Sequence, residues 1–567
     1  MVELRADEVG YRYPKAASEA LAGVTVDFRG LTAVLGGTGS GKSTLLMSLN
    51  GVVPQLTGGR LRGRVRLDGA DLAGYRVQTI AGFVGLVLQD AESQLLGRTA
   101  SEDVAFGPRN QLVPADEIRR RIPEVLEAVG LAGFESRETA QLSGGEKQRL
   151  AIAGVLALRP QVLCLDEPAS ELDPAGRRAL YGVIDDLRRL GVTIVVAEHD
   201  GIDVAARADR LVLLDGGAVA WQGAPSAFYR DPGLAGRVRP LPVAVVGHEL
   251  ASAGLISRDR VPLEVDQAEA LIRSLAGDRA LPPPVVATGP EVTQEPVIEV
   301  RNLWHTYPAG PGLQGVELTI GWGEYVALVG ANGAGKTTLA KHLNGLLQPT
   351  AGTVTVNGVA AAGRKPWELA RHVGYVFQNP DHQIFNATVA AEVRYGLRLA
   401  GLPSAEIEAR IDEVLERTGL TGFRDVHPFS LGKGLRQRLA VASVLAMRPA
   451  ILVVDEPTTG QDWPGTQAML SLIDQLNAEG TTILLISHDL EVVARHARRV
   501  VALEAGEVVS DGPTAEVLGR PEVLARAGIP PTQAVELCAR LWPGRPPLLD
   551  ATVLGRHLAT VLAGDGR

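Results

Sequence analysis

A glycine-rich stretch of the form G-x-x-x-x-G-K-[ST] occurs twice in this chain of 567 residues, as GGTGSGKS at 36–43 and as GANGAGKT at 330–337. Each copy follows a short apolar run and precedes a helix-forming run, which is the strand–loop–helix context that a phosphate-binding loop needs. The glycines let backbone N–H groups turn toward phosphate oxygens at the start of a helix. One match could be an accidental glycine-rich turn, but two in the same context predict two phosphate-binding loops.

The sequence around each stretch is also repeated, in the same order and at nearly the same spacing. Lys42 and Lys336 are 294 residues apart, and VLCLDEPAS at 162–170 recurs 289 residues later as ILVVDEPTT at 451–459. The segments VVAEHD and LLISHD keep the offset of 289 residues. Self-similarity of this extent indicates a duplicated domain. At roughly 100–200 residues per domain, a chain of this length should hold about three to four units.

Each glycine-rich stretch supplies the groups that bind a nucleotide phosphate and its metal. We expect Lys42 and Lys336 at the β- and γ-phosphates of ATP, and the hydroxyls of Ser43 and Thr337 at Mg²⁺. Further ATP contacts are expected from the glycines and the next hydroxyl residue of each stretch, namely Gly36, Gly39, Gly41, Thr44, Gly330, Gly333, Gly335 and Thr338.

A pair of acidic residues ends an apolar run in each repeat, and such runs are typical of buried parallel strands. Asp166 and Asp455 are expected to hold magnesium, directly or through water. Glu167 and Glu456 are then placed to polarise the water that attacks ATP. A carboxylate at a strand end can simply be solvated, but this pair recurs at a matched distance from a phosphate loop.

Two further polar residues recur in each repeat. His199 and His488 each lie 33 residues after the magnesium-binding aspartate, and this recurrence favours a γ-phosphate contact over a structural role. Gln89 and Gln378 follow the apolar strands FVGLVLQ and HVGYVFQ and could reach the metal or the water.

One tyrosine precedes each phosphate loop. Tyr13 and Tyr307 both lie 29 residues before the loop lysine. Isolated tyrosines are often core residues, but the matched spacing favours stacking on the ATP base.

Composition narrows the possible partners. The net charge of −9 and the pI of about 5.7 argue against nucleic acid as a ligand, because phosphate backbones usually need a basic face. The two cysteines, Cys164 and Cys538, have no CxxC partner, so neither a disulfide framework nor a zinc site is expected. We expect no signal region and no transmembrane helix, and therefore a cytosolic protein that reaches a membrane only through another chain.

The segment LSGGEKQR at 142–149 resembles the signature of the ATP-binding-cassette (ABC) ATPases, and it is more specific than the phosphate loop. The resemblance covers about residues 1–230 and 294–525. It implies tandem α/β P-loop domains, each with a helical signature subdomain, at about 92–160 and 381–448. In this family two cassettes pair head to tail, and each ATP is clamped between the phosphate loop of one cassette and the signature of the other.

The second signature departs from the pattern and reads LGKGLRQR at 431–438. By the family pairing, the ATP on Lys336 meets Ser143, Gly144 and Gly145, whereas the ATP on Lys42 meets Gly432, Lys433 and Gly434. Losing one hydrogen bond to a charged group costs roughly 1.5–3 kcal/mol. Lys433 could restore the attraction as a cation or crowd the backbone. We therefore expect two unequal sites; the alternative is that the change is tolerated drift.

The repeats define the expected domain organisation: cassettes at 1–230 and 297–525, helical C-terminal extensions at 231–277 and 526–567, and a Pro-rich linker at 278–296. The two extensions share a proline pair or near-pair, an apolar-spaced segment and a second proline break, so each is predicted to be a small pair of helices. Because this similarity is loose, two unrelated helical tails remain the alternative.

A narrower resemblance is to the ATPases of energy-coupling factor (ECF) importers. The segments QDAESQLLG at 89–97 and QNPDHQIFN at 378–386 look like that group's segment after the glutamine, and the paired extensions look like its C-terminal additions. The resemblance implies two partners in the membrane, a transmembrane (T) subunit and a small substrate-binding (S) subunit. The cargo would be a vitamin, a vitamin precursor or a metal ion.

Three other functions are alternatives for a tandem cassette chain. A soluble tandem cassette that acts on the ribosome would need a basic helical connector, and residues 278–296 contain only four charged residues. The fused ATPase of a sugar importer would differ in its partner, a periplasmic-type binding protein. A DNA-repair cassette is disfavoured because two scattered cysteines cannot build a zinc module.

Overall fold

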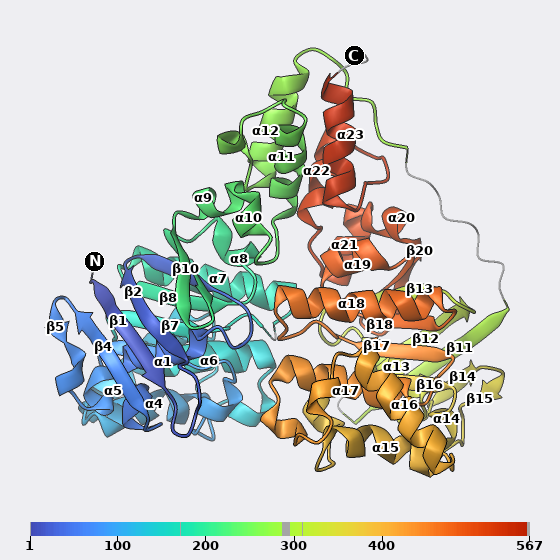
Figure 1. Ribbon diagram of the computed structural model, residues 1–567, viewed down its shortest axis with the longest axis horizontal. Helices are drawn as coiled ribbons and strands as arrows, with labels where there is room; N and C mark the ends of the chain where they lie inside the picture. Colours follow the sequence, from blue (N-terminus) through green and yellow to red (C-terminus); the bar gives the residue numbers. More distant parts are fainter. Residues whose placement is uncertain (1, 171, 286–294, 309, 564–567) are drawn as a thin grey trace. The chain divides into compact units, whose positions relative to one another are not determined.

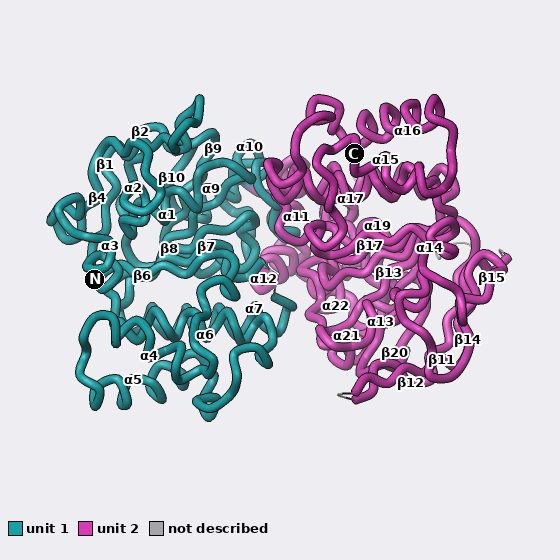
Figure 2. Tube along the Cα trace, turned by 90° about the horizontal axis from the view of Figure 1, so that it is seen from below, with its two compact units in different colours: residues 1–244, 257–263 teal, residues 245–256, 264–567 magenta. Residues whose placement is uncertain are grey.

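The computed structural model describes residues 2–170, 172–285, 295–308 and 310–563. It separates into two compact units, residues 1–244 with 257–263 and residues 245–256 with 264–567 (Figure 2). Each unit contains one copy of the repeat. Residues 286–294 of the linker expected at 278–296 lie outside the described residues.

Unit 1 contains two sheets. A four-stranded antiparallel sheet has the order β2-β1-β4-β5, with β1 Leu4–Arg12, β2 Leu21–Phe28, β4 Arg60–Leu67 and β5 Ala70–Asp71. A six-stranded sheet has the order β10-β9-β3-β8-β7-β6, with β3 Leu31–Leu35, β6 Val84–Val87, β7 Val162–Asp166, β8 Thr193–Glu198, β9 Arg210–Asp215 and β10 Ala218–Gly223. All its neighbouring strands run parallel except β9 and β10.

Figure 1 shows the helices of unit 1 around its sheets. The signature subdomain consists of α4 Ala100–Asn110, α5 Ala115–Ala128 and α6 Gly144–Leu156. The other helices of the unit are α1 Lys42–Asn50, α2 Val52–Gln55, α3 Val77–Ile80, α7 Pro174–Arg189, α8 Ile202–Ala205, α9 Pro225–Arg230 and α10 Pro232–Ala235.

Unit 2 repeats both sheets. The antiparallel sheet has the order β12-β11-β14-β15, with β11 Pro296–Tyr307, β12 Gly310–Gly321, β14 Ala351–Val356 and β15 Val359–Ala360. The larger sheet has the order β16-β17-β18-β13-β19-β20, with β13 Tyr325–Val329, β16 Val373–Val376, β17 Ile451–Asp455, β18 Thr482–Ile486, β19 Arg499–Glu504 and β20 Glu507–Pro513. Its cassette helices are α13 Lys336–Leu343, α14 Pro366–Leu369, α15 Val389–Leu399, α16 Ser404–Arg417, α17 Lys433–Leu445, α18 Trp463–Ala478, α19 Leu490–His496, α20 Thr514–Leu518 and α21 Pro521–Ala527.

The central strands of both larger sheets are buried along their whole length, which explains their apolar sequences. Every residue of β3, β7, β8 and of their copies β13, β17, β18 is buried. Strands covered on both faces must be apolar throughout, so the expected α/β fold with parallel strands is confirmed. Ligands of such sheets bind at the carboxyl ends of the strands, where the motif residues lie.

The helical extensions of the two halves lie together in unit 2 (Figure 1). They consist of α11 Pro242–Ser252, α12 Val265–Ala276, α22 Gln533–Leu541 and α23 Ala551–Ala563, of which only the first three residues of α11 belong to unit 1. Arg540 of α22 forms ion pairs with Asp266 and Glu269 of α12. A β-carbon on Gly555 of α23 would lie 2.7 Å from Cβ of Glu249, so α23 crosses α11 closely.

Within the described ranges, none of the helices combines the length and the apolar character needed to cross a bilayer.

Candidate ATP and magnesium sites

Each phosphate loop joins a buried strand to a helix through glycines that no other residue could replace without strain. Gly41, the residue before α1, has φ 101°, and its copy Gly335 before α13 has φ 102°. A β-carbon on Gly41 would lie 2.7 Å from the carbonyl oxygen of Ala20. The loop therefore brings backbone N–H groups to a helix N-terminus, the arrangement that binds phosphate.

The loop lysines lie inside their loops. Lys42 and Lys336 are only 4% and 7% exposed. Lys42 Nζ donates to the carbonyls of Gly36 at 2.8 Å and Gly37 at 3.2 Å, and Lys336 Nζ donates to the two matching carbonyls at 2.7 and 3.0 Å. Burial lowers the pKa of Lys42, although Glu167 opposes this change.

A hydroxyl and a strand-end carboxylate meet beside each lysine. Thr337 Oγ1 donates to Asp455 Oδ2 at 3.1 Å, and a hydrogen bond with Ser43 acts on Asp166. Burial raises the pKa of Asp166 to about 6 and also raises the pKa of Asp455. Asp166 Oδ1 is buried and has no hydrogen-bond partner in the described part of the chain.

These groups fit magnesium. Mg²⁺ is commonly held by one or two oxygen ligands of the protein together with nucleotide phosphates and water. In the described residues no cluster of three or more His, Cys, Asp or Glu side chains could hold a metal by itself. Ser43 with Asp166, and Thr337 with Asp455, would therefore hold Mg²⁺ through ATP, and the metal would neutralise charge on the phosphates.

The glutamate after each aspartate has a left-handed backbone. Glu167 has φ 47° and Glu456 has φ 48°, a conformation that costs roughly 1–3 kcal/mol for a residue other than glycine. Their amides donate to Ala197 and Ile486 at 2.9 Å, which ties each glutamate to the neighbouring strand. Strain of this kind at both copies is typical of a functional position.

In the first site three predicted residues meet on Glu167. His199 Nε2 lies 2.7 Å from Oε1, Gln89 Nε2 donates to Oε2 at 2.8 Å, and Lys42 Nζ lies 3.5 Å from Oε1. Burial alone would raise the pKa of Glu167, but His199 and Lys42 lower it below its usual value. Glu167 is therefore held as an anion.

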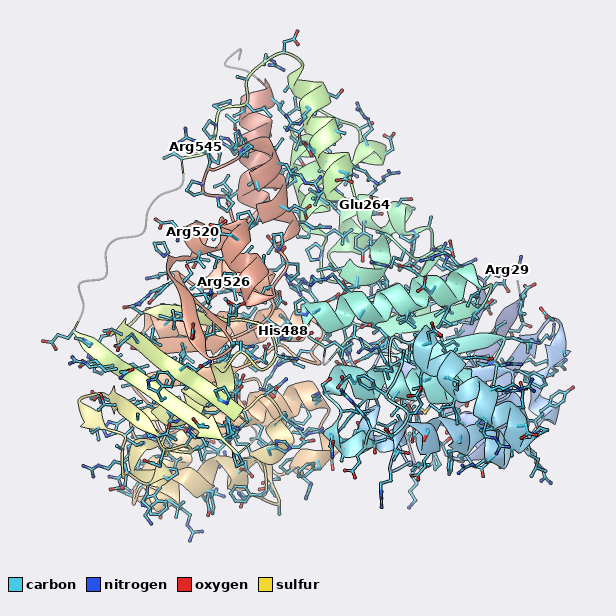
Figure 3. All side chains as sticks on the ribbon, turned by 180° about the vertical axis from the view of Figure 1, so that it is seen from behind. Arg29, Glu264, His488, Arg520, Arg526 and Arg545 are labelled. Carbon is cyan, nitrogen blue, oxygen red and sulfur yellow. The ribbon has the colours of Figure 1, made fainter. Side chains whose placement is uncertain are left out.

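The second site brings together fewer of the predicted residues. His488, which follows β18 (Figure 3), approaches Glu456 Oε1 with Nδ1 at 2.7 Å, and its amide donates to the same oxygen at 3.0 Å. Glu456 Oε2 is buried without a hydrogen-bond partner among the described residues. Gln378 therefore does not take the position that Gln89 has in the first site.

Each tyrosine expected at the ATP base lies against the hydroxyl after its phosphate loop. Tyr13 Oη is 3.1 Å from Thr44 Oγ1, and Tyr307 Oη is 3.2 Å from Thr338 Oγ1. An aromatic ring supports each tyrosine edge-on, with centroid distances of 4.7 Å for Tyr13 and 4.6 Å for Tyr307. Both tyrosines lie beside the loop they were assigned to.

The two signatures share a backbone but differ in their caps. Ser143 precedes α6 with φ −65° and ψ 160°, and Gly432 precedes α17 with φ −64° and ψ 158°. Ser143 forms a capping box with Glu146: the Ser143 amide donates to Glu146 Oε2 at 2.8 Å, and the Glu146 amide donates to Ser143 Oγ at 3.3 Å. Gly432 has no side chain to accept from the helix, and Leu435 replaces the glutamate, so neither bond of the capping box forms in the second signature. Gly144 and Gly145, like Lys433 and Gly434, begin the helices themselves.

Sequence reasoning missed two buried residues beside these sites. Tyr375 Oη donates to Asp455 Oδ2 at 2.9 Å, whereas Leu86 has the same position in the first repeat. Glu198, next to His199, accepts a hydrogen bond from Tyr181 Oη at 3.1 Å, and burial raises the pKa of Glu198 far above its usual value. A comparison of the repeats position by position would have marked Tyr375.

Two phosphate loops, each beside a strand-end Asp-Glu pair, define a P-loop ATPase with two nucleotide-binding cassettes. Residues 23–170 and 313–459 match the family described as ABC transporter. The chain belongs to that family, and its cassettes hydrolyse ATP.

Relatives match over nearly the full chain. An ABC transporter ATP-binding protein of Methanosarcina acetivorans is 39% identical over 555 residues, which cover 95% of this chain and 90% of that protein. One of Caldanaerobacter subterraneus subsp. tengcongensis is 35% identical over 549 residues, covering 95% and 96%. Among solved structures, cbiO1 from Clostridium perfringens is 33% identical to this chain, with a TM-score of 0.38. The match covers 41% of this chain and 95% of the cbiO1 chain.

Proposed function

We propose that this chain is the magnesium-dependent ATPase subunit of an ECF-type importer, bound at the cytoplasmic face of the membrane. It would energise uptake of a vitamin, a vitamin precursor or a metal ion through a T subunit and an S subunit. The proposal rests on two matched segments, residues 89–97 and 378–386, each of which exposes a large apolar side chain. We name them the docking segments.

Each docking segment presents one large apolar side chain to solvent. Leu96 is 65% exposed and Phe385, at the matching position, is 63% exposed. An exposed aromatic ring follows in each cassette, Phe106 on α4 and Tyr395 on α15. The rings of Phe385 and Tyr395 meet edge-on, with their centroids 4.8 Å apart. Exposed apolar groups gathered in this way are typical of a protein-binding surface.

A buried carboxylate fixes the backbone of each docking segment. Asp103 Oδ1 accepts from the amides of Leu96 at 2.7 Å and Gly97 at 2.9 Å. Glu392 Oε2 accepts from the amides of Phe385 at 3.0 Å and Asn386 at 2.7 Å. A backbone that is already fixed loses little conformational entropy when a partner binds, so an exposed apolar side chain on it is suited to binding. A loop that only faces solvent would not need such anchoring.

Each docking segment is also joined to the first turn of the signature helix. Lys147 of α6 forms an ion pair with Glu92 at 2.8 Å, and Arg436 of α17 forms one with Asp381 at 2.6 Å. A partner that moves a docking segment would therefore pull on the signature of the same cassette. This supports coupling between a membrane subunit and ATP turnover.

We further propose that each ATP is shared by the phosphate loop of one cassette and the signature of the other. The ATP on Lys336 would then meet the capped Ser143, and the ATP on Lys42 would meet Gly432 and Lys433. The site with Ser143 and Glu456 would carry most of the turnover.

Replacing the exposed side chains tests the docking segments. Leu96→Glu and Phe385→Glu should reduce co-purification with the membrane subunits at least tenfold and leave basal ATPase activity unchanged, because a buried charge is costly at an apolar interface. Leu190→Glu, at an exposed leucine after α7, serves as the control and should change neither quantity. An intact complex in both docking variants would show that these segments are ordinary surface loops.

The identity of the partners separates this proposal from its rivals. Mass spectrometry of the complex purified from membranes should find small integral membrane proteins. Co-sedimentation with ribosomes, or a periplasmic-type binding protein as the specific partner, would instead favour one of the other two functions.

A further inference from the structure

A tyrosine of the second cassette lies against the carboxylate proposed to hold magnesium. Tyr375 on β16 is 7% exposed, and its hydroxyl donates to Asp455 Oδ2 at 2.9 Å. Thr337 Oγ1 donates to the same oxygen at 3.1 Å. Two hydroxyl groups on one carboxylate oxygen fix the orientation of the other oxygen.

The strand register explains how the tyrosine reaches this carboxylate. β16 pairs in parallel with β17, and Tyr375 lies opposite Val453. Asp455 is two residues further along and therefore on the same face of the sheet as Val453. A tyrosine side chain is long enough to span that step. Phe377, whose ring centroid lies 4.9 Å from that of Tyr375, packs beside it.

The first cassette has the same register without the hydroxyl. Leu86 on β6 lies opposite Cys164 on β7, again two residues before the aspartate, Asp166. A leucine has no hydrogen-bond donor. Leu86 therefore leaves the orientation of Asp166 without the second hydroxyl contact that Asp455 has, and Asp166 Oδ1 is buried without a hydrogen-bond partner in the described ranges.

We propose that Tyr375 is a positioning residue for magnesium in the second cassette, so that the second ATP site saturates at a lower Mg²⁺ concentration than the first. The inference rests on the proposed role of Asp455 as a magnesium ligand. Magnesium demands nearly ideal octahedral geometry, so a ligand held in one orientation binds it better. Loss of a group that orients a metal ligand typically weakens metal affinity by about 10–100-fold.

The test is Tyr375→Phe in the full chain, which removes one oxygen atom and keeps the ring. In a Glu167→Gln background, where hydrolysis reports the second site, the half-saturating Mg²⁺ concentration should rise about tenfold, the low end of that range. Binding of a fluorescent ATP analogue in EDTA, and the melting temperature without ligands, should stay unchanged. Tyr375→Leu, which copies the first cassette, should give the same shift.

Tyr325→Phe is the matched control. Tyr325 is a buried tyrosine of the same sheet whose hydroxyl has no hydrogen-bond partner among the described residues. Its variant should keep the wild-type magnesium dependence. An unchanged Mg²⁺ requirement in Tyr375→Phe, or an equal loss of metal-free nucleotide binding, would overturn the inference. If the wild-type chain needed no magnesium, the role of Asp455 itself would fall.

Discussion

At the scale of single residues, the two ATP sites share a backbone and differ in side chains. The left-handed glutamates Glu167 and Glu456 have φ angles within 1° of each other. Around them, His199 approaches its glutamate with Nε2 and His488 with Nδ1, and only Glu167 accepts from a glutamine. The duplication has therefore kept the strained backbone while the hydrogen bonds around it have diverged.

Lys433 illustrates this divergence. A β-carbon on Gly460 would lie 3.2 Å from Lys433 Nζ and 3.3 Å from Cδ and Cε, so the lysine side chain lies over that glycine. Gly460 follows the Asp455-Glu456 pair within the same cassette and has φ 69°. Lys433 is thus packed against the loop after Asp455 and Glu456, and the small residue at 460 provides the space.

The buried carboxyl group of Glu198 predicts a dependence of stability on pH. Its folded-state pKa is raised by burial, so the folded protein keeps a proton that the unfolded chain releases above about pH 4.5. The free energy of unfolding therefore falls by up to about 1.4 kcal/mol per pH unit until the folded pKa is reached. Glutamine does not ionise and still accepts from Tyr181. When the pH is raised from 6 to 8, the melting temperature of Glu198→Gln should fall less than that of the wild type. Equal falls would contradict the claim that Glu198 is protonated in the folded protein.

At the scale of helices and strands, the close crossing of α11 and α23 depends on Gly555. Any side chain there would press on Glu249 and on the Cα atom of Val246, which lies 3.1 Å from the β-carbon position. Gly555→Leu should therefore destabilise unit 2 by roughly 1–3 kcal/mol, the usual cost of overpacking. Denaturant unfolding measures this, with Val553→Leu, at an exposed position of α23, as the control. Equal unfolding midpoints for the two variants would show that α11 and α23 can move apart without loss of stability.

Much of the fold could be predicted from these elements. The apolar runs that end in Asp166 and Asp455 are buried strands, as predicted, because only a strand covered on both faces has such a sequence. Tyr375 could not be assigned a role, because its contact with Asp455 depends on the register of two strands 80 residues apart. The packing of α12 against α22 could not be predicted from the sequence either, because a proline pattern predicts helices but not which helices pack together.

At the scale of the whole molecule, the two repeats share their sheets and the anchors of their docking segments but differ in contacts at the nucleotide sites. Both cassettes have sheets of the same strand order, and both anchor their docking segments with a buried carboxylate. Among the described residues, the signature cap, the glutamine contact and the tyrosine on the strand-end aspartate are each seen in one cassette and not in the other. This distribution favours a transporter subunit with two similar partner surfaces and two unequal ATP sites.

Side-by-side measurement of ATPase activity in Glu456→Gln and Glu167→Gln tests the central claim most directly. Each substitution removes the group proposed to polarise water in one site and leaves the other site intact. A transition-state contact weakened by about 1.4 kcal/mol slows a step roughly tenfold. Because Gly432 lacks the serine hydroxyl, the site proposed to use it should hydrolyse ATP more slowly than the other site. We predict at least a tenfold greater loss from Glu456→Gln than from Glu167→Gln. Equal losses, or a greater loss from Glu167→Gln, would contradict the account.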